Sequence, residues 1–199
     1  MRSSMKKGLV GRCPRCFIRA EHCICADIPR IANQIEIVIV RHQWEQRKST
    51  GTARIAELAL ERCRCLQIGY DPAPVDQQLA ALTDAWLLFP DGGRAVLPTT
   101  RPGRLVVLDG TWAQVVRMRR RLGALAELPR FSLPPKPVPP LRLRRSARPE
   151  DRSTLEAIAD ALALLEGDAT SGPLSLLHDR YVHRVLRARG ALPRRATPP

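Results

Sequence analysis

Four cysteines near the start of the sequence have the spacing of a metal-binding site. Cys13, Cys16, Cys23 and Cys25 form the pattern Cys-x2-Cys-x6-Cys-x-Cys, and four thiolates can close a tetrahedral shell around Zn²⁺. With cysteine at every position, no place remains for a catalytic water, so the pattern predicts a structural zinc ion. Two alternatives stay open: free thiols without a metal, and a site in which His22 replaces one sulfur.

A carboxylate stands where an apolar run meets a helical pattern, in the sequence Asp109-Gly110-Thr111-Trp112. Open α/β sheets bind ligands at the carboxyl ends of their strands. Gly110 allows a tight turn there, and the N–H groups of the following helix point toward the same place. Thr111 and Gln114 have the spacing of a capping box, so we expect Thr111 to cap the helix and to leave Asp109 free for a ligand. The alternative is that Asp109 only caps the helix and Trp112 only fills the core.

A third stretch, from residue 41 to residue 51, combines cations, hydroxyls and a glycine at the expected start of a helix. That combination suits the binding of phosphate groups, from an RNA or from a small ligand. The alternative is a solvated, charged loop. The residues predicted to contact RNA are Arg41, His42, Arg47, Lys48, Ser49 and Thr50.

The overall charge also favours a nucleic-acid partner. The 199-residue chain carries 33 Lys and Arg against 19 Asp and Glu, a formal net charge of +14, and so basic a surface attracts polyanions. The alternative is that an arginine-rich composition reflects a bias of the genome. No apolar run approaches the roughly 18 residues of a membrane helix, and the short Leu9-Val10 stretch after Lys6 and Lys7 does not fit a signal peptide. We therefore expect a cytoplasmic protein without membrane contact, in which disulfides are not expected.

Strands and helices alternate along the sequence, which indicates an α/β domain with a mainly parallel sheet. Ser153 and Glu156 repeat the capping-box spacing, and five prolines within 133–140 predict an extended loop. Cys63 and Cys65, at a helix end and a strand start, are interpreted as ordinary small core residues. The predicted strands are 35–40, 65–69, 85–89 and 105–108. The predicted helices are 49–63, 75–82, 111–122, 153–165 and 175–189.

Several motifs follow one another in a distinctive order. A cysteine-rich start is followed by a strand with His-x-x-Glu-x-x-Lys-Ser-Thr-Gly, then by Leu-Leu-Phe-Pro, Asp-Gly-Thr-Trp-x-Gln and Ser-Thr-Leu-Glu-Ala. This order, between about residues 13 and 189, resembles the DTW-domain family, named for an Asp-x-Thr-Trp motif that Asp109, Thr111 and Trp112 supply. Lys-Ser-Thr-Gly is a small departure from the Ser- or Asn-Thr-Gly expected of the family.

The resemblance implies a SPOUT-related fold, with helices on both faces of a mainly parallel sheet and a trefoil knot in its C-terminal half. It also implies S-adenosylmethionine as donor of a 3-amino-3-carboxypropyl group, and N3 of a tRNA uridine as acceptor. Asp109 is the candidate base for the N3 proton, and its alternative role is to hold the amino group of the donor. The residues expected to bind the donor are Leu88, Phe89, Pro90, Leu108, Gly110, Thr111 and Trp112, with Ser153, Thr154 and Glu156 closing the pocket.

Two other functions stay open. One is a SPOUT-type RNA methyltransferase with the same fold and cofactor, and the other is a zinc-bearing RNA-binding protein without catalysis. No Gly-x-Gly-x-x-Gly follows a predicted strand, which argues against a Rossmann-type methyltransferase or dehydrogenase. A monomer and a homodimer are both compatible with the sequence. The expected organisation is a zinc-binding segment over 1–32, a catalytic domain over 33–190 and a disordered tail over 191–199.

Overall fold

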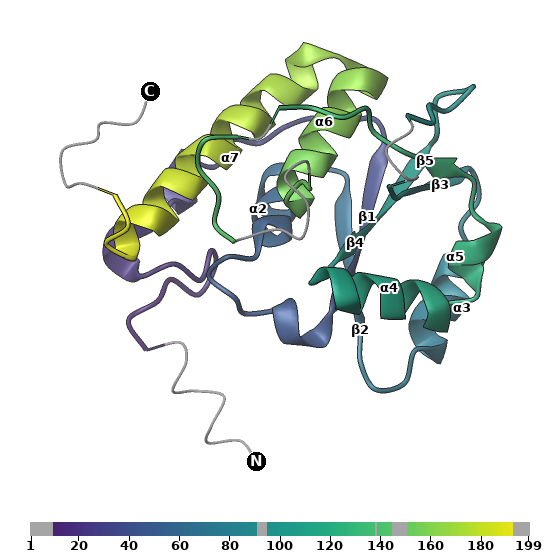
Figure 1. The fold of residues 1–199 in the computed structure, drawn as a ribbon, viewed down its shortest axis with the longest axis horizontal. Coiled ribbons are helices and arrows are strands. Elements are labelled where there is room, and N and C mark those ends of the chain that lie inside the picture. The colour runs from purple at the N-terminus through teal and green to yellow at the C-terminus, as the bar shows by residue number, and fades with distance from the viewer. Residues whose placement is uncertain (1–9, 91–94, 138, 145–150, 193–199) are drawn as a thin grey trace.

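A parallel β-sheet of five strands forms the centre of the protein (Figure 1). The computed structural model describes residues 10–90, 95–137, 139–144 and 151–192. The strands are ordered β2-β1-β4-β3-β5, and every neighbouring pair is parallel. They are β1 (Glu36–His42), β2 (Cys63–Ile68), β3 (Ala85–Leu88), β4 (Arg104–Asp109) and β5 (Arg130–Phe131).

Helices cover both faces of the sheet, which explains why the inner strands β1 and β4 are apolar almost throughout. Ile37 and Ile39 of β1 pack into the core on one face, whereas Val38 and Val40 pack into the core on the other. The first core lies under α2 (Thr52–Ala59), α6 (Thr154–Glu166) and α7 (Asp168–Ala188). The second lies under α3 (Ala73–Ala80), α4 (Trp112–Arg121) and α5 (Ala124–Glu127).

The register of β1 against β4 brings two of the predicted motifs together. Arg41, near the end of β1, lies directly opposite Asp109, the last residue of β4. Because parallel strands end at the same edge of a sheet, the segments that follow residues 42, 88 and 109 share that edge. A short 3₁₀ turn, η3 (Gln43–Glu45), follows β1 there.

The cysteine-rich segment packs against the last helix. It contains two 3₁₀ turns, η1 (Ala20–His22) and η2 (Cys25–Asp27), and buries Ile18 and Ile24 in the same core as α7. Arg184 of α7 donates hydrogen bonds to the carbonyl oxygen of Cys23 at 3.3 Å and to the carboxylate of Asp27 at 3.0 Å. The segment shares a core with the sheet, so no break in packing among the described residues marks the domain boundary that was predicted at residue 32. That boundary stays a prediction.

The predicted α/β class with helices on both faces of a parallel sheet is confirmed, but several element bounds differ. The helix predicted over 49–63 extends only from Thr52 to Ala59, because Leu60 is extended and forms a bridge with Ile31. The last helix begins seven residues before position 175, at Asp168, and includes Pro173. The sequence did not predict α5 or β5. Residues 193–199 of the predicted tail lie outside the described residues.

None of the helices within the described ranges is both long enough and apolar enough to cross a membrane.

Candidate functional site

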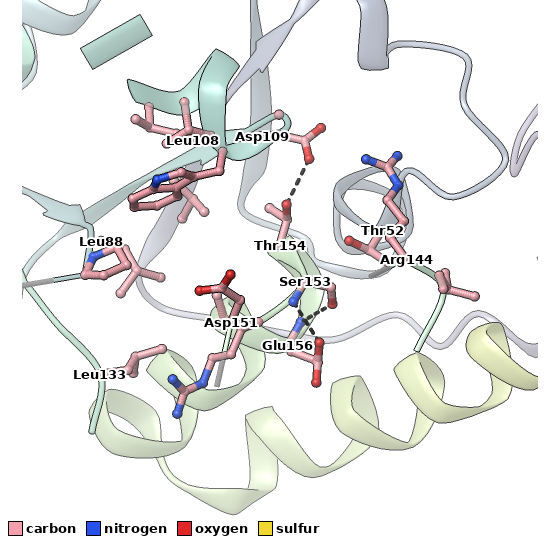
Figure 2. A pocket seen from close by; sticks show the side chains of 18 of the residues that line it. Thr52, Leu88, Leu108, Asp109, Leu133, Arg144, Asp151, Ser153, Thr154 and Glu156 are labelled. Carbon is pink, nitrogen blue, oxygen red and sulfur yellow. Dashed lines mark hydrogen bonds between the residues drawn. The ribbon is translucent and has the colours of Figure 1, made fainter. Parts of the chain in front are cut away.

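A cavity of about 600 Å³ lies at the carboxyl ends of β3 and β4 (Figure 2). Its floor consists of the strand ends, and residues from 132–135, from 141–144 and from the first turn of α6 enclose it. Every residue predicted to bind the donor lines this cavity, together with Asp109. Segments that are about 70 residues apart in the sequence therefore contribute to a single site.

The cavity wall is mainly apolar, with an aromatic pair at its mouth. Leu88 and Leu108 are each 8% exposed at the strand ends. The rings of Phe89 and Trp112 stack with centroids 5.7 Å apart, and the guanidinium of Arg119 lies 4.8 Å from the Phe89 ring centre. Trp112 is 46% exposed, so it does not merely fill the core.

Two helices begin at the cavity, and a capping box fixes the start of each. The backbone N–H of Thr111 donates to Oε1 of Gln114 at 2.7 Å, and the N–H of Gln114 donates to Oγ1 of Thr111 at 3.4 Å. Ser153 and Glu156 repeat this exchange at the start of α6, at 2.7 and 3.3 Å. The partial positive charge of both helix ends is therefore directed at one cavity.

Gly110 is favoured by the close approach of Gln114 rather than by an unusual backbone conformation. A Cβ at position 110 would lie 3.1 Å from Cβ of Gln114 and 3.2 Å from its Oε1. Those atoms belong to the side chain that completes the capping box. A larger residue at position 110 would therefore require Gln114 to shift by a few tenths of an ångström.

The carboxylate of Asp109 is not free, contrary to our expectation. Asp109 is 6% exposed; its Oδ2 accepts a hydrogen bond from Nε of Arg41 at 2.9 Å, and its Oδ1 accepts one from Oγ1 of Thr154 at 2.8 Å (Figure 2). A carboxylate has about four lone-pair sites. Each oxygen of Asp109 thus keeps capacity for one more donor.

The ion pair of Asp109 continues as a chain of alternating charges toward the cysteine-rich segment. Nη1 of Arg41 lies 3.3 Å from Oε2 of Glu57, which in turn lies 3.0 Å from Nη1 of Arg54. Nε of Arg54 donates to the carbonyl oxygen of Arg15 at 3.0 Å, within the first cysteine pair. The chain therefore links the cavity to the cysteine segment.

The residues predicted to contact RNA are separated in the structure. Arg41 is buried with its carboxylate partners and does not reach the surface, because the alternation of β1 turns it into the protein. His42, Ser49 and Thr50 are half-buried, and Thr50 lines the cavity. Arg47 and Lys48 are exposed.

A buried carboxylate fastens the loop after β1 to the rim of the cavity. Glu45 is 3% exposed and accepts hydrogen bonds from Lys48 at 2.5 Å and from Arg144 at 3.0 Å. Burial alone would raise the pKa of Glu45, but these two cations outweigh it and lower the pKa below its ordinary value of 4.5. Arg144 also donates to Oγ1 of Thr50 at 2.7 Å.

Sequence reasoning missed several cavity residues that come from other parts of the chain. His178 of α7 is 6% exposed, and its Nε2 lies 3.1 Å from Oγ of Ser153 and 3.7 Å from Oε2 of Glu156. No local pattern marks these positions, because the loop path and the packing of α7 decide which of their residues face the cavity. The missed residues include Thr52, Leu133, Arg142, Arg144, Asp151, Arg152 and His178.

The four cysteines of the first segment lie together and could hold a metal ion. Their sulfur atoms all lie within 4.8 Å of one another, with Cys13 and Cys25 at 3.6 Å and Cys16 and Cys23 at 3.8 Å. Zn–S bonds of about 2.3 Å in a tetrahedron require sulfur atoms about 3.8 Å apart. The donor set therefore fits zinc, and His22 is not part of the cluster.

Cys63 and Cys65 differ from the cysteine cluster. Both lie on β2 and pack against the core. Burial raises the pKa of Cys63 to about 12 and that of Cys65 to about 11. Thiols of this kind are unreactive at neutral pH. The sequence had predicted that they lie within the core, but both side chains are only half-buried against it.

Comparison with known proteins identifies a family and a curated relative. Residues 10–186 match the sequence model of the DTW domain. A protein of Drosophila melanogaster named tRNA-uridine aminocarboxypropyltransferase 2 is 28% identical over 167 residues. The match covers 78% of this chain and 66% of the relative, so the chain spans slightly less than two thirds of that protein. No solved structure matches.

Proposed function

The chain belongs to the DTW domain family, and from this membership we propose that it is a tRNA-modifying transferase. In the specific form of this proposal, it transfers the 3-amino-3-carboxypropyl group of S-adenosylmethionine to N3 of a tRNA uridine. The name of the Drosophila melanogaster relative supports the reaction. The observation that carries the proposal is that all residues expected to bind the donor line one cavity at the strand ends.

The cavity offers matching groups for each part of the donor. Its apolar wall and the Phe89–Trp112 pair suit the adenosine portion. The two helix N-termini favour a carboxylate, and the carboxylate side chains of Asp109, Asp151 and Glu156 favour an ammonium and a sulfonium. The donor carries all three charges, and binding them at once would orient it.

The chemistry depends on orientation, because a sulfonium activates every carbon attached to it. In the proposed step, uridine N3 bonds to the terminal carbon of the aminocarboxypropyl group and the bond from that carbon to sulfur breaks. Methylthioadenosine leaves with the bonding electrons, and the N3 proton passes to solvent water. Selection of this carbon over the methyl group is a matter of positioning.

We assign Asp109 to the donor's ammonium group rather than to the N3 proton. Both of its oxygens already accept hydrogen bonds, from Arg41 and from Thr154, and this fixes the carboxylate in place. The remaining lone pairs can accept two N–H groups of an ammonium. Preorganisation of this kind suits a residue that holds a substrate.

Mass spectrometry of tRNA nucleosides after incubation with protein and donor tests the reaction. The expected product is a uridine that gains the aminocarboxypropyl group, whereas a gain of one methyl group would indicate the methyltransferase alternative. Unchanged tRNA with retained RNA binding would indicate a non-catalytic protein and would refute the proposal.

Asp109→Asn and Asp109→Ala test the assignment of this residue. If Asp109 holds the donor, both changes weaken donor affinity and turnover together. If it is the base, Asp109→Asn loses most of the rate and keeps donor affinity. A lower melting temperature with nearly normal transfer per folded molecule would show that Asp109 has only a structural role.

We also propose that the four cysteines hold a structural zinc ion, which would crosslink residues 13–25 and support the core contacts of Ile18 and Ile24. The fit of the sulfur spacing to tetrahedral coordination supports this. Because four thiolates fill the shell, the ion would supply no catalytic water.

For the fold, we propose the SPOUT-related arrangement with a trefoil knot. Its support is the strand order, in which β4 lies between β1 and β3, and the return of the chain over the ends of β3 and β4 before α6. An experimental chain trace through residues 138–150 tests it, since an unthreaded path would exclude the knot.

A further inference from the structure

Two large aromatic side chains are exposed on the loops that follow β1 and β2. Trp44 in η3 is 68% exposed, and Tyr70 is 85% exposed. The backbone beneath each ring is held in place: the N–H of Trp44 donates to His42 at 3.4 Å, and Arg121 donates to the carbonyl oxygen of Tyr70 at 2.6 Å. Held backbones with exposed rings are suited to stacking against a planar partner.

Helix α4 joins these two loops into one strip along the edge of the sheet. Arg121 contacts the Tyr70 loop directly. Burial lowers the pKa of His42, beside Trp44. The charge of Glu45 opposes this effect on the pKa, whereas the charges of Arg117, Lys48 and Arg121 add to it. In Figure 1 the loops after β1 and β2 lie with α4 along the lower edge of the view.

The strip is strongly basic. Helix α4 contains four arginines and no carboxylate. Arg117 and Arg120 are exposed, and neither forms an ion pair with a described residue. The carboxylate of Glu45 in η3 is buried between Lys48 and Arg144. Asp71, next to Tyr70, is an exposed acid in the strip and accepts a hydrogen bond from the N–H of Ala73 at 3.0 Å. Free guanidinium groups beside exposed rings are the combination that single-stranded nucleic acid requires.

The same helix connects the strip to the cavity. Trp112, the first residue of α4, lines the cavity mouth and is 46% exposed. N3 of uridine is the atom that donates a hydrogen bond in base pairing, so a uridine modified there must be unpaired. Its neighbours in the RNA are then also available for stacking.

We propose that Trp44, Tyr70, Arg117 and Arg121 bind unpaired nucleotides that flank the modified uridine. The two rings stack on bases. Arg117 pairs with a phosphate, and Arg121, which donates one hydrogen bond to the carbonyl oxygen of Tyr70, has further N–H donors for a second phosphate. This inference rests on the proposed function only in taking RNA as the substrate. It adds a binding surface outside the cavity, at positions that the 41–51 motif alone does not define.

RNA affinity, measured by fluorescence anisotropy with labelled tRNA and with a labelled single-stranded oligonucleotide, tests the stacking. Alanine substitution of a stacking aromatic removes about 1–3 kcal/mol, so Trp44→Ala and Tyr70→Ala are each expected to weaken binding about 5- to 150-fold. Trp44→Phe and Tyr70→Phe keep a ring and are expected to retain most of the affinity. The matched control is Leu176→Ala, which removes an exposed apolar side chain from α7 on the other side of the sheet.

Salt dependence tests the arginines. Arg117→Ala is expected to reduce the slope of log affinity against log salt by about 0.7–0.9. Arg180→Ala removes the same charge from the exposed face of α7 and is expected to leave the slope unchanged. Melting temperatures of all variants should equal that of the wild type, because the substituted side chains are exposed.

The outcomes separate this inference from the proposed function. If Trp44→Ala and Tyr70→Ala bind RNA as the wild type does, the surface inference is refuted even where transfer is intact. If only Arg117→Ala weakens binding, the strip binds RNA through charge alone, as it would bind any polyanion, and the stacking part of the inference is refuted. If the wild type transfers nothing but both alanine variants lose RNA affinity, the surface stands and the proposed reaction fails.

Discussion

The ion pair between Arg41 and Asp109 gives the sharpest test of how the site is built. Arg41→Met keeps most of the volume of the side chain and removes its charge. Asp109, 6% exposed, would then keep only the hydroxyl of Thr154 as a partner. A buried carboxylate that loses its cation is strongly disfavoured, because low-dielectric surroundings do not replace the lost solvation.

The expected cost is large. Removal of one partner from a buried pair destabilises a protein by about 3–5 kcal/mol. For a chain of this size, each kcal/mol lowers the melting temperature by about 2–4 °C, so Arg41→Met should lower it by about 6–20 °C. Arg30 and Glu61 form a matched surface pair, with side chains 85% and 37% exposed. Arg30→Met should cost at most about 1 kcal/mol.

Urea denaturation of both variants, together with a double-mutant cycle of Arg41→Met and Asp109→Asn, measures these values. A coupling free energy of about 1–3 kcal/mol is expected between the two buried residues. If Arg41→Met costs no more than Arg30→Met, or if the two changes are additive, Arg41 does not hold Asp109 and our account of the site is refuted.

Three further predictions concern stability. Protein prepared without chelator should contain one zinc ion per chain by elemental analysis, and Cys23→Ser should lower the melting temperature; a fully folded, metal-free protein would contradict the site. The pKa of Glu45 is lowered in the folded state. The contribution of Glu45 to folding stability is therefore complete above its ordinary pKa of 4.5 and is lost as the pH falls from there through the lower pKa of the folded state. Glu45→Gln should therefore flatten the acid limb of a stability-against-pH curve, and an unchanged curve would argue against this role. Thr111→Ala should cost about 1 kcal/mol in urea denaturation and Thr111→Ser much less, whereas equal values would show that the capping hydroxyl is unimportant.

Features set by neighbouring residues could be predicted from the sequence. Both capping boxes begin helices where the spacing placed them, at Thr111 and Ser153, because the bonds involved span only three residues. The apolar central strands could also be predicted, because a buried parallel strand is recognisable from the composition of a short stretch of sequence. The order of strand, Asp109 and helix likewise placed a carboxylate at the cavity.

Features set by contacts between distant segments could not be predicted. β5 has two residues and exists only because it pairs with β3. The start of α7 was missed because Gly172 and Pro173 argue against a helix, yet Thr170 and Ser171 are buried there. Arg41 looked like a phosphate ligand because its partners, Asp109 and Glu57, are distant in sequence. His178 carried no local signal, since only the packing of α7 brings it to Ser153.

The contact between α7 and the cysteine-rich segment has a consequence for synthesis of the chain. Arg184 can reach Cys23 and Asp27 only after α7 has been made. At about 5–20 residues per second, a ribosome needs about 8–30 s to progress from Cys25 to Ala188. During that interval the thiol of Cys16, which is 1% exposed in the finished fold, is open to oxidants. A metal ion captured by the emerging segment would protect the thiols before any core exists to bury them.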